Sequence, residues 1–255
     1  MTPPPTTARV EAYLREQLAG GPLHFTLIDP DKSRGPRAAA LARGAVALGS
    51  HAILLGGSTG ISREVMSEAA RAIKESVKIP AIIFPEGPGS LTPDADAVLF
   101  MSLLNSRNLD LVIRTHARSS SLVRHMQLEA IPMGYLVVAP GMRVGEVGAV
   151  DPVPRDDLSG AAGYALAAEL LGMRFVYLEA GSGAPAPVPS EMVRAVRDVL
   201  GIPLIVGGGI RSGAEARSLL QAGANILVTG TITEEEGLGD AFRGILEEVR
   251  HARGR

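Results

Sequence analysis

Two glycine-rich stretches in the second half of this 255-residue sequence could bind an anionic ligand. Residues 207–211 read GGGIR and residues 229–231 read TGT. Glycines leave backbone N–H groups uncovered, and the N-terminus of a following helix adds positive potential. This pattern predicts a phosphate site; the alternative is that the glycines only permit tight turns. The predicted phosphate-binding loops are therefore Gly207–Arg211 and Thr229–Thr231.

A single carboxylate, Glu179, ends another apolar run, in the sequence YLEAGSG. A carboxylate in such a place costs free energy unless it meets a hydroxyl, a cation or a metal. We therefore predict that Glu179 is a general base for a substrate alcohol. The alternative is a carboxylate that pairs with an arginine at the rim. Gly181 and Gly183, just beyond it, would let the backbone approach a ligand closely.

A second carboxylate, Asp29, follows an earlier apolar run in the sequence IDPDK. One carboxylate suits Mg²⁺, which usually takes its other ligands from phosphates and water. The alternative is an aspartate that caps the turn before a helix. Ser58, in LLGGSTG, could offer its hydroxyl to the same metal or to a diphosphate, the alternative being a helix cap. Two separate anion-handling regions predict two phosphorylated ligands.

The elements that must position these residues alternate along the chain. Most of the apolar runs are continuous, as in buried parallel strands, and helical patterns lie between them. One example is the stripe of apolar residues that recurs every four positions from Ile61 to Val77. The predicted strands are residues 23–28, 51–55, 80–84, 97–101, 132–138, 174–178, 203–206 and 225–229.

Eight strands with interleaved helices predict an α/β fold, a (β/α)8 or TIM barrel formed by residues 1–255 as one domain. A doubly wound sheet is the alternative, but glycine clusters follow several strands rather than the first alone. Residues 85–96, PEGPGSLTPDAD, are too short and too rich in breakers for a helix. The third helix is therefore expected to be replaced by a loop or extended segment. An extra helix is expected at about residues 7–19.

The third and fourth predicted strands carry large apolar residues that could form a groove where that helix is missing. The alternative is that they are ordinary core residues. The residues concerned are Phe84, Phe100, Met101, Leu103 and Leu104.

Composition excludes several classes of function. The formal net charge is −2, so a basic surface for nucleic acid is not expected. The chain has no cysteine, which rules out disulfides, thiolate nucleophiles and cysteine-ligated metals. No apolar run approaches the roughly 20 residues of a membrane span, and the first residues lack the pattern of a secretory signal. We therefore expect a cytoplasmic protein.

Seven blocks in order resemble the geranylgeranylglyceryl phosphate synthase family, and the resemblance covers nearly the whole chain. The blocks are TLIDPDK (26–32), ILLGGST (53–59), FMSLLNSRN (100–108), PMGYLVVAPG (132–141), VYLEAGSG (176–183), IVGGGIRS (205–212) and VTGT (228–231). The family fold is a modified TIM barrel without its third helix. The resemblance implies Mg²⁺-dependent transfer of a geranylgeranyl group to the 3-hydroxyl of sn-glycerol 1-phosphate. It also implies a homo-oligomer, a dimer or a hexamer, that makes transient contact with a membrane.

By motif, the resemblance assigns Asp29 and Ser58 to Mg²⁺ near the prenyl diphosphate. It makes Glu179 and Tyr177 the catalytic residues. The residues implied to surround glycerol phosphate are Tyr177, Leu178, Glu179, Ala180, Gly181, Ser182, Gly183, Gly208, Gly209, Gly230 and Thr231.

Other functions use the same barrel. A sugar-phosphate isomerase or lyase would use the last two strands but would not need an apolar groove. An FMN-binding barrel would be yellow when purified. A non-catalytic phosphoprotein-binding barrel would tolerate the loss of Glu179.

Overall fold

The computed structural model describes residues 9–57, 59–235 and 237–254. Within them, eight parallel strands form a closed barrel in the order in which they occur along the chain. The α/β barrel predicted from the apolar runs is therefore confirmed. The strands are β1 (Leu23–Ile28), β2 (Ala52–Leu55), β3 (Ala81–Ile83), β4 (Ala97–Leu103), β5 (Glu129–Val137), β6 (Phe175–Glu179), β7 (Leu204–Gly207) and β8 (Ile226–Thr229).

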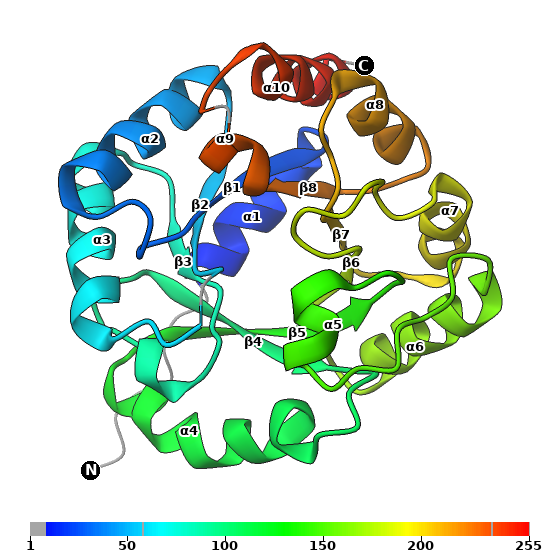
Figure 1. The fold of residues 1–255 in the computed structure, drawn as a ribbon, viewed down its shortest axis with the longest axis horizontal. Coiled ribbons are helices and arrows are strands. Elements are labelled where there is room, and N and C mark those ends of the chain that lie inside the picture. The colour runs from blue at the N-terminus through cyan, green and yellow to red at the C-terminus, as the bar shows by residue number, and fades with distance from the viewer. Residues whose placement is uncertain (1–8, 58, 236, 255) are drawn as a thin grey trace.

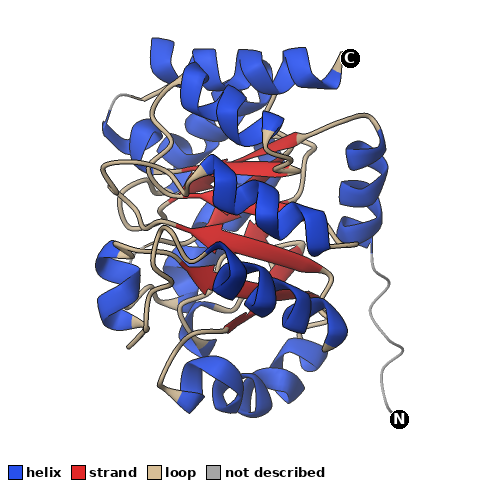
Figure 2. Ribbon diagram, turned by 90° about the vertical axis from the view of Figure 1, so that its right-hand side faces the viewer, coloured by secondary structure: helices blue, strands red, loops and turns tan. Residues whose placement is uncertain are grey.

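Helices form a ring around the barrel, as Figure 1 shows, and Figure 2 shows the strands enclosed between them. Each buries its apolar side against the outside of the sheet, which is why the stripe from Ile61 to Val77 predicted a helix there. The helices of the ring are α2 (Gly35–Leu48), α3 (Arg63–Ser76), α4 (Thr115–His125), α6 (Leu158–Leu170), α7 (Ser190–Val199), α8 (Gly213–Gln221) and α10 (Asp240–Arg253).

The extra helix expected before the first strand is present as α1 (Arg9–Ala19). It lies at the end of the barrel where the strands begin. There Glu129, the first residue of β5, accepts hydrogen bonds from the N-terminal turn of α1. Oε2 of Glu129 accepts from the N–H of Val10 at 2.7 Å and Oε1 from that of Glu11 at 2.8 Å. The start of the barrel is thus closed by α1.

Between β3 and β4, where all residues are described, the chain forms no α-helix. A single 3₁₀ turn, η1 (Pro88–Ser90), takes its place, as the prolines and glycines of this segment predicted. Side chains fix the loop: the carboxylate of Asp96 accepts from the N–H of Ala81 at 2.9 Å, and the hydroxyls of Ser67 and Thr92 are 2.6 Å apart. The missing helix leaves this side of the barrel open to a ligand.

Four local features go beyond what the sequence patterns indicate or differ from it. Residues 139–156 are rich in glycine and proline, which favours a loop, yet they contain a short helix, α5 (Met142–Val147). The fourth helix begins with a wider π-helical turn, η2 (Asp110–Arg114). Serine is a common N-cap residue, but Ser190 is the first helical residue of α7, the N-cap is Pro189, and the Ser190 hydroxyl bonds the Glu191 carboxylate rather than the helix backbone. Another short helix, α9 (Thr231–Glu235), follows β8.

The core has two layers, one inside the barrel and one between barrel and helices. Along each strand alternate side chains point inward and outward, so successive residues join different layers. Phe25, Tyr177 and Ile205 belong to the inner layer, whereas Ile28 and Leu178 belong to the outer one. Because both layers are tightly packed, the residues at the strand ends have fixed positions. In the described part of the chain, no helix has the length and apolar character that crossing a bilayer requires.

Candidate active site

Glu179 is the last residue of β6 and is only 7% exposed. Its Oε1 accepts the backbone N–H of Gly181 at 2.7 Å, and its Oε2 accepts the hydroxyl of Tyr135 at 3.0 Å. The hydroxyl of Tyr177 also donates to this carboxylate. Among the described residues no lysine or arginine pairs with it, so the alternative of a rim ion pair does not apply.

Burial raises the pKa of the Glu179 carboxyl above its usual value. The hydrogen bonds from Gly181, Tyr135 and Tyr177 lower that pKa in part, because they stabilise the ionised form. The pKa values of both tyrosines are raised well above the ordinary value, first by burial and then by the nearby carboxylate. The tyrosines therefore stay protonated, so Glu179 is the group that can accept a proton.

Tyr135 is a residue that sequence reasoning did not identify. It lies opposite Tyr177 in the register of β5 and β6, and the two rings are 5.0 Å apart. Phe84 packs edge-on against both, at 5.6 and 5.9 Å. The sequence signal that could have identified Tyr135 is its place in the alternation of PMGYLVV, which determines whether its side chain points into the barrel. That direction can be assigned only once the register between β5 and β6 is known.

A small cavity of about 60 Å³ adjoins Glu179 at the ends of β6, β7 and β8. It brings together most of the residues predicted to bind glycerol phosphate. The predicted residues that line it are Tyr177, Glu179, Ser182, Gly183, Gly208, Gly209, Gly230 and Thr231. The side chains of Leu178 and Ala180 lie in the outer core layer, so only their backbone could contribute.

Gly208 and Gly209 both have a positive φ, at 80° and 72°. A Cβ at Gly208 would lie 2.2 Å from Oε1 of Glu179, and one at Gly209 would lie 2.6 Å from the carbonyl oxygen of Ala186. These two positions require glycine for conformation and for space. Glycine backbone therefore forms part of the cavity lining, which also includes Ser182 and Thr231, whose hydroxyls hydrogen bond to each other at 2.7 Å. Such a lining suits an anion of the size of phosphate.

A larger cavity of about 460 Å³ extends from the other side of Glu179. It runs past Phe84 toward Val98, Phe100 and Val123, on the side of the barrel that lacks the third helix. Of the residues that could form an apolar groove, Phe84, Phe100, Met101 and Leu103 line this cavity, whereas Leu104 packs against the outer core layer. Leu27, Tyr177, Glu179 and Ser182 line both cavities. Glu179 consequently lies where a small polar site and a long apolar site meet.

Asp29 lies just beyond β1 and is 2% exposed. Its Oδ1 accepts the N–H of Asp31 at 3.0 Å, and Nζ of Lys32 is 3.6 Å from its Oδ2. Gly57, in the loop after β2, lies close to the same oxygen: a Cβ added at Gly57 would be 3.7 Å from it. The structure thus brings the ends of β1 and β2 together, as expected. Ser58, the other residue predicted at this site, lies outside the described residues.

Comparisons with known proteins agree with this architecture. Residues 13–249 match the sequence profile of the PcrB family. The chain belongs to the PcrB family. The geranylgeranylglyceryl phosphate synthase of Pyrococcus horikoshii is 49% identical over 243 residues, which are 95% of this chain and 96% of that protein. That of Methanothrix thermoacetophila is 50% identical over 230 residues, which are 90% and 89% of the two chains.

A solved structure has the same fold. It is the (S)-3-O-geranylgeranylglyceryl phosphate synthase of Thermoplasma acidophilum, in complex with its substrate sn-glycerol-1-phosphate. The two structures superimpose with a TM-score of 0.90 at 44% identity, over 95% of this chain and 98% of that one. The fold predicted from the family resemblance is therefore confirmed.

At the position where magnesium is predicted, the described residues of this PcrB-family chain offer a single carboxylate, that of Asp29. They contain no group of three or more side chains of metal-binding type. Asp29 offers one buried carboxylate next to the larger cavity, which is lined by neighbouring Lys32 and Gly57. Mg²⁺ commonly takes one or two carboxylates and completes its octahedron with phosphate oxygens and water. The donor set fits an ion shared between Asp29 and a diphosphate.

Proposed function

We propose that this chain is a geranylgeranylglyceryl phosphate synthase. It transfers the geranylgeranyl group of geranylgeranyl diphosphate to the 3-hydroxyl of sn-glycerol 1-phosphate and releases diphosphate, in ether phospholipid biosynthesis. The observation that carries the proposal is Glu179 at the junction of two cavities, one lined by glycine backbone and one long and apolar. The names of relatives near 50% identity support the same reaction.

We infer a role for each residue from its position. Backbone N–H groups around Gly208, Gly209 and Gly230 bind the phosphate of the acceptor, which turns its 3-hydroxyl toward Glu179. The hydroxyl oxygen forms a bond to the first carbon of the prenyl chain, and the bond from that carbon to the diphosphate oxygen breaks, its electron pair leaving with diphosphate. Glu179 takes the hydroxyl proton, and Tyr135 and Tyr177 hold its carboxylate in place.

We assign the magnesium site to Asp29, together with Ser58 as the resemblance implies. A bound Mg²⁺ would neutralise charge on the diphosphate and make it a better leaving group. Asp29 suits this role because it is buried beside the cavity and already orders its turn through the N–H of Asp31. Ser58 stays a prediction.

The apolar cavity provides the binding free energy for the prenyl chain. Burial of hydrocarbon contributes about 0.8 kcal/mol per CH₂. A sugar-phosphate isomerase or lyase would have no use for a cavity of about 460 Å³ lined by Val98, Phe100 and Leu111. Three expectations stay predictions: the homo-oligomer, the membrane contact and the cytoplasmic location. Light scattering after gel filtration would measure the oligomeric state.

The direct test is an assay of the purified protein with sn-glycerol 1-phosphate and a series of prenyl diphosphates, with and without Mg²⁺. We expect an ether product, most rapidly from geranylgeranyl diphosphate, and no product in the presence of a chelator. Colourless protein is expected, since a yellow one would indicate FMN. Turnover of a sugar phosphate without any prenyl transfer would overturn the proposal.

A further inference from the structure

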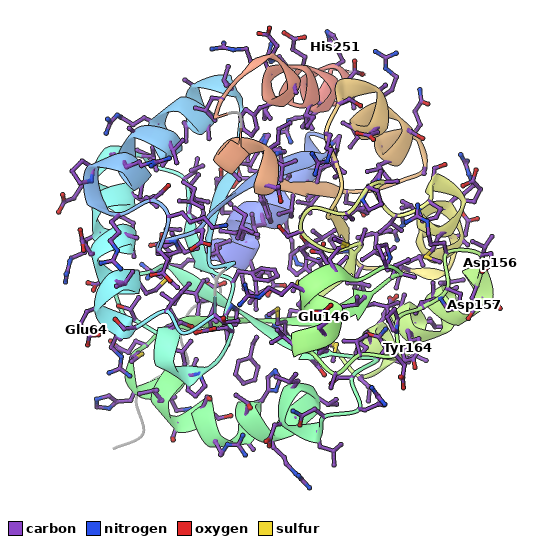
Figure 3. All side chains as sticks on the ribbon, in the orientation of Figure 1. Glu64, Glu146, Asp156, Asp157, Tyr164 and His251 are labelled. Atoms are coloured by element: carbon purple, nitrogen blue, oxygen red, sulfur yellow. The ribbon has the colours of Figure 1, made fainter. Side chains whose placement is uncertain are left out.

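Arg143 spans the mouth of the barrel. It lies on α5, which lies beside β5 and β6 in Figure 1, and the neighbouring Glu146 marks this helix in Figure 3. Nη2 of Arg143 donates to the hydroxyl of Thr59 at 2.9 Å, across 84 residues of sequence. The contact joins the segment after β5 to the glycine-rich loop after β2, on the side of the mouth where Asp29 lies.

Few positively charged side chains line the larger cavity, and Arg143 is one of them. Lys32 and Arg143 are the two lysine or arginine residues among those that line the larger cavity. Lys32 lies near the carboxylate of Asp29. Arg143, by contrast, bonds a neutral hydroxyl, and no carboxylate among the described residues pairs with it. Glu86, an acidic residue of the same lining, accepts the N–H groups of Gly60 and Ile61 instead. The guanidinium therefore has donors left for an anionic ligand.

The same short helix also contributes to the apolar lining. Val144 and Val147 lie beside Arg143 along α5, and both line the larger cavity. This short helix thus places a cation at the loop after β2 and valine side chains in the lining of the groove. This arrangement matches a ligand with an anionic head and a hydrocarbon tail.

We propose that Arg143 binds the diphosphate of the prenyl substrate; the inference rests on the proposed function. A prenyl diphosphate is trianionic, and one Mg²⁺ at Asp29 leaves negative charge to be matched. A planar guanidinium bonds phosphate oxygens in a bidentate geometry that an ammonium group does not reproduce. In this view the hydroxyl of Thr59 orients Arg143 toward the head group. A purely structural role, in which the contact only ties two loops together, predicts a different pattern of variants.

The experiment is calorimetric titration in the presence of Mg²⁺, with two ligands titrated separately. One is an unreactive thiolo analogue of geranylgeranyl diphosphate and the other is sn-glycerol 1-phosphate. The variants are Arg143→Gln, Arg143→Lys and Thr59→Val. The matched control is Arg107→Gln, because Arg107 is exposed, pairs with Asp151 at 3.2 Å and lines neither cavity. Thermal unfolding of each variant shows that it is folded.

We expect Arg143→Gln to weaken binding of the analogue by about 10- to 100-fold, as the loss of charge-assisted hydrogen bonds does. Binding of glycerol phosphate should change by less than about twofold, because that cavity does not include Arg143. Arg143→Lys should restore part of the affinity, because it keeps the charge without the fork. Arg107→Gln should bind both ligands as the wild type does.

Three outcomes would overturn the inference. Arg143→Gln could bind the analogue as tightly as the wild type, or it could weaken both ligands equally. Thr59→Val removes only the orienting hydroxyl and should cost less than Arg143→Gln; if it reproduced the full loss, the contact would be a tie between loops. A wild-type protein that binds no prenyl diphosphate analogue would instead overturn the proposed function, and this inference with it.

Discussion

Two glutamates on neighbouring strands are both buried, but they lie at opposite ends of the barrel. Glu129 begins β5 and is 5% exposed, and Glu179 ends β6 and is 7% exposed. Glu129 uses both oxygens to accept backbone N–H groups of α1. Glu179 accepts one N–H and the tyrosine hydroxyls, and it borders two cavities.

The difference shows that burial of a carboxylate does not by itself indicate catalysis. At the start of the barrel the partners of Glu129 are fixed parts of a helix, and nearby Glu11 is paired with Arg15 and Arg174. At the mouth the partners of Glu179 leave it open to a ligand. Variants at the two ends should therefore separate stability from turnover.

The largest effect is expected for Glu179→Gln. The amide keeps the shape of the side chain but cannot accept a proton from the acceptor hydroxyl. Turnover should fall by about 10²- to 10⁴-fold with substrate affinities little changed. Steady-state kinetics with both substrates measures this. Near-normal turnover with weaker binding would demote Glu179 to a positioning residue.

Asp29→Asn should act on the metal rather than on the proton. The amide can keep the turn hydrogen bond to Asp31 but lowers the negative charge of the site. Changes in the surroundings of a metal ligand cost about 10- to 100-fold in affinity, so loss of the ligand itself should raise the Mg²⁺ requirement at least as much. Titration of activity with Mg²⁺ measures it, and Asp31→Asn, in the same turn but exposed, is the control. Full activity of Asp29→Asn without added metal would contradict the assignment.

Much of the fold and of the candidate site could be predicted from the sequence. Continuous apolar runs located the strands, and the strand ends located Glu179, Asp29 and the glycine loops, because all parallel strands of a barrel end on one face. The prolines and glycines of residues 85–96 predicted the missing helix, since they leave no room for helical hydrogen bonds.

The remainder depends on contacts that only the closed barrel creates. The α5 and α9 helices are too short to show a period in the sequence. Tyr135 reaches Glu179 through the register of two strands, and Arg143 meets Thr59 across the mouth. No local pattern contains these pairs, because their members are 44 and 84 residues apart.

At the start of the barrel, Glu129→Gln should lower stability and spare catalysis. Its amide can accept from one of the α1 N–H groups, but its NH₂ group faces the other, which loses its partner. A buried donor without a partner costs about 1–3 kcal/mol, so the free energy of unfolding should fall by that amount. Chemical denaturation measures it, with Glu16→Gln, at an exposed position of α1, as the control. Normal stability with impaired turnover would reverse the distinction between the two ends.

The smallest effect is expected for Tyr135→Phe, which removes one hydrogen bond from the Glu179 carboxylate. That bond lowers the pKa of Glu179, so its loss should raise the pKa further. The base acts only when ionised, and activity is lost as the pH falls through its pKa. The acid limb of the rate profile should therefore move to higher pH, while turnover on the alkaline side of that limb changes by about tenfold or less. Tyr177→Phe should move the limb in the same direction, because its hydroxyl donates to the same carboxylate. A limb that stays in place in both variants would mean that a group other than Glu179 takes the proton.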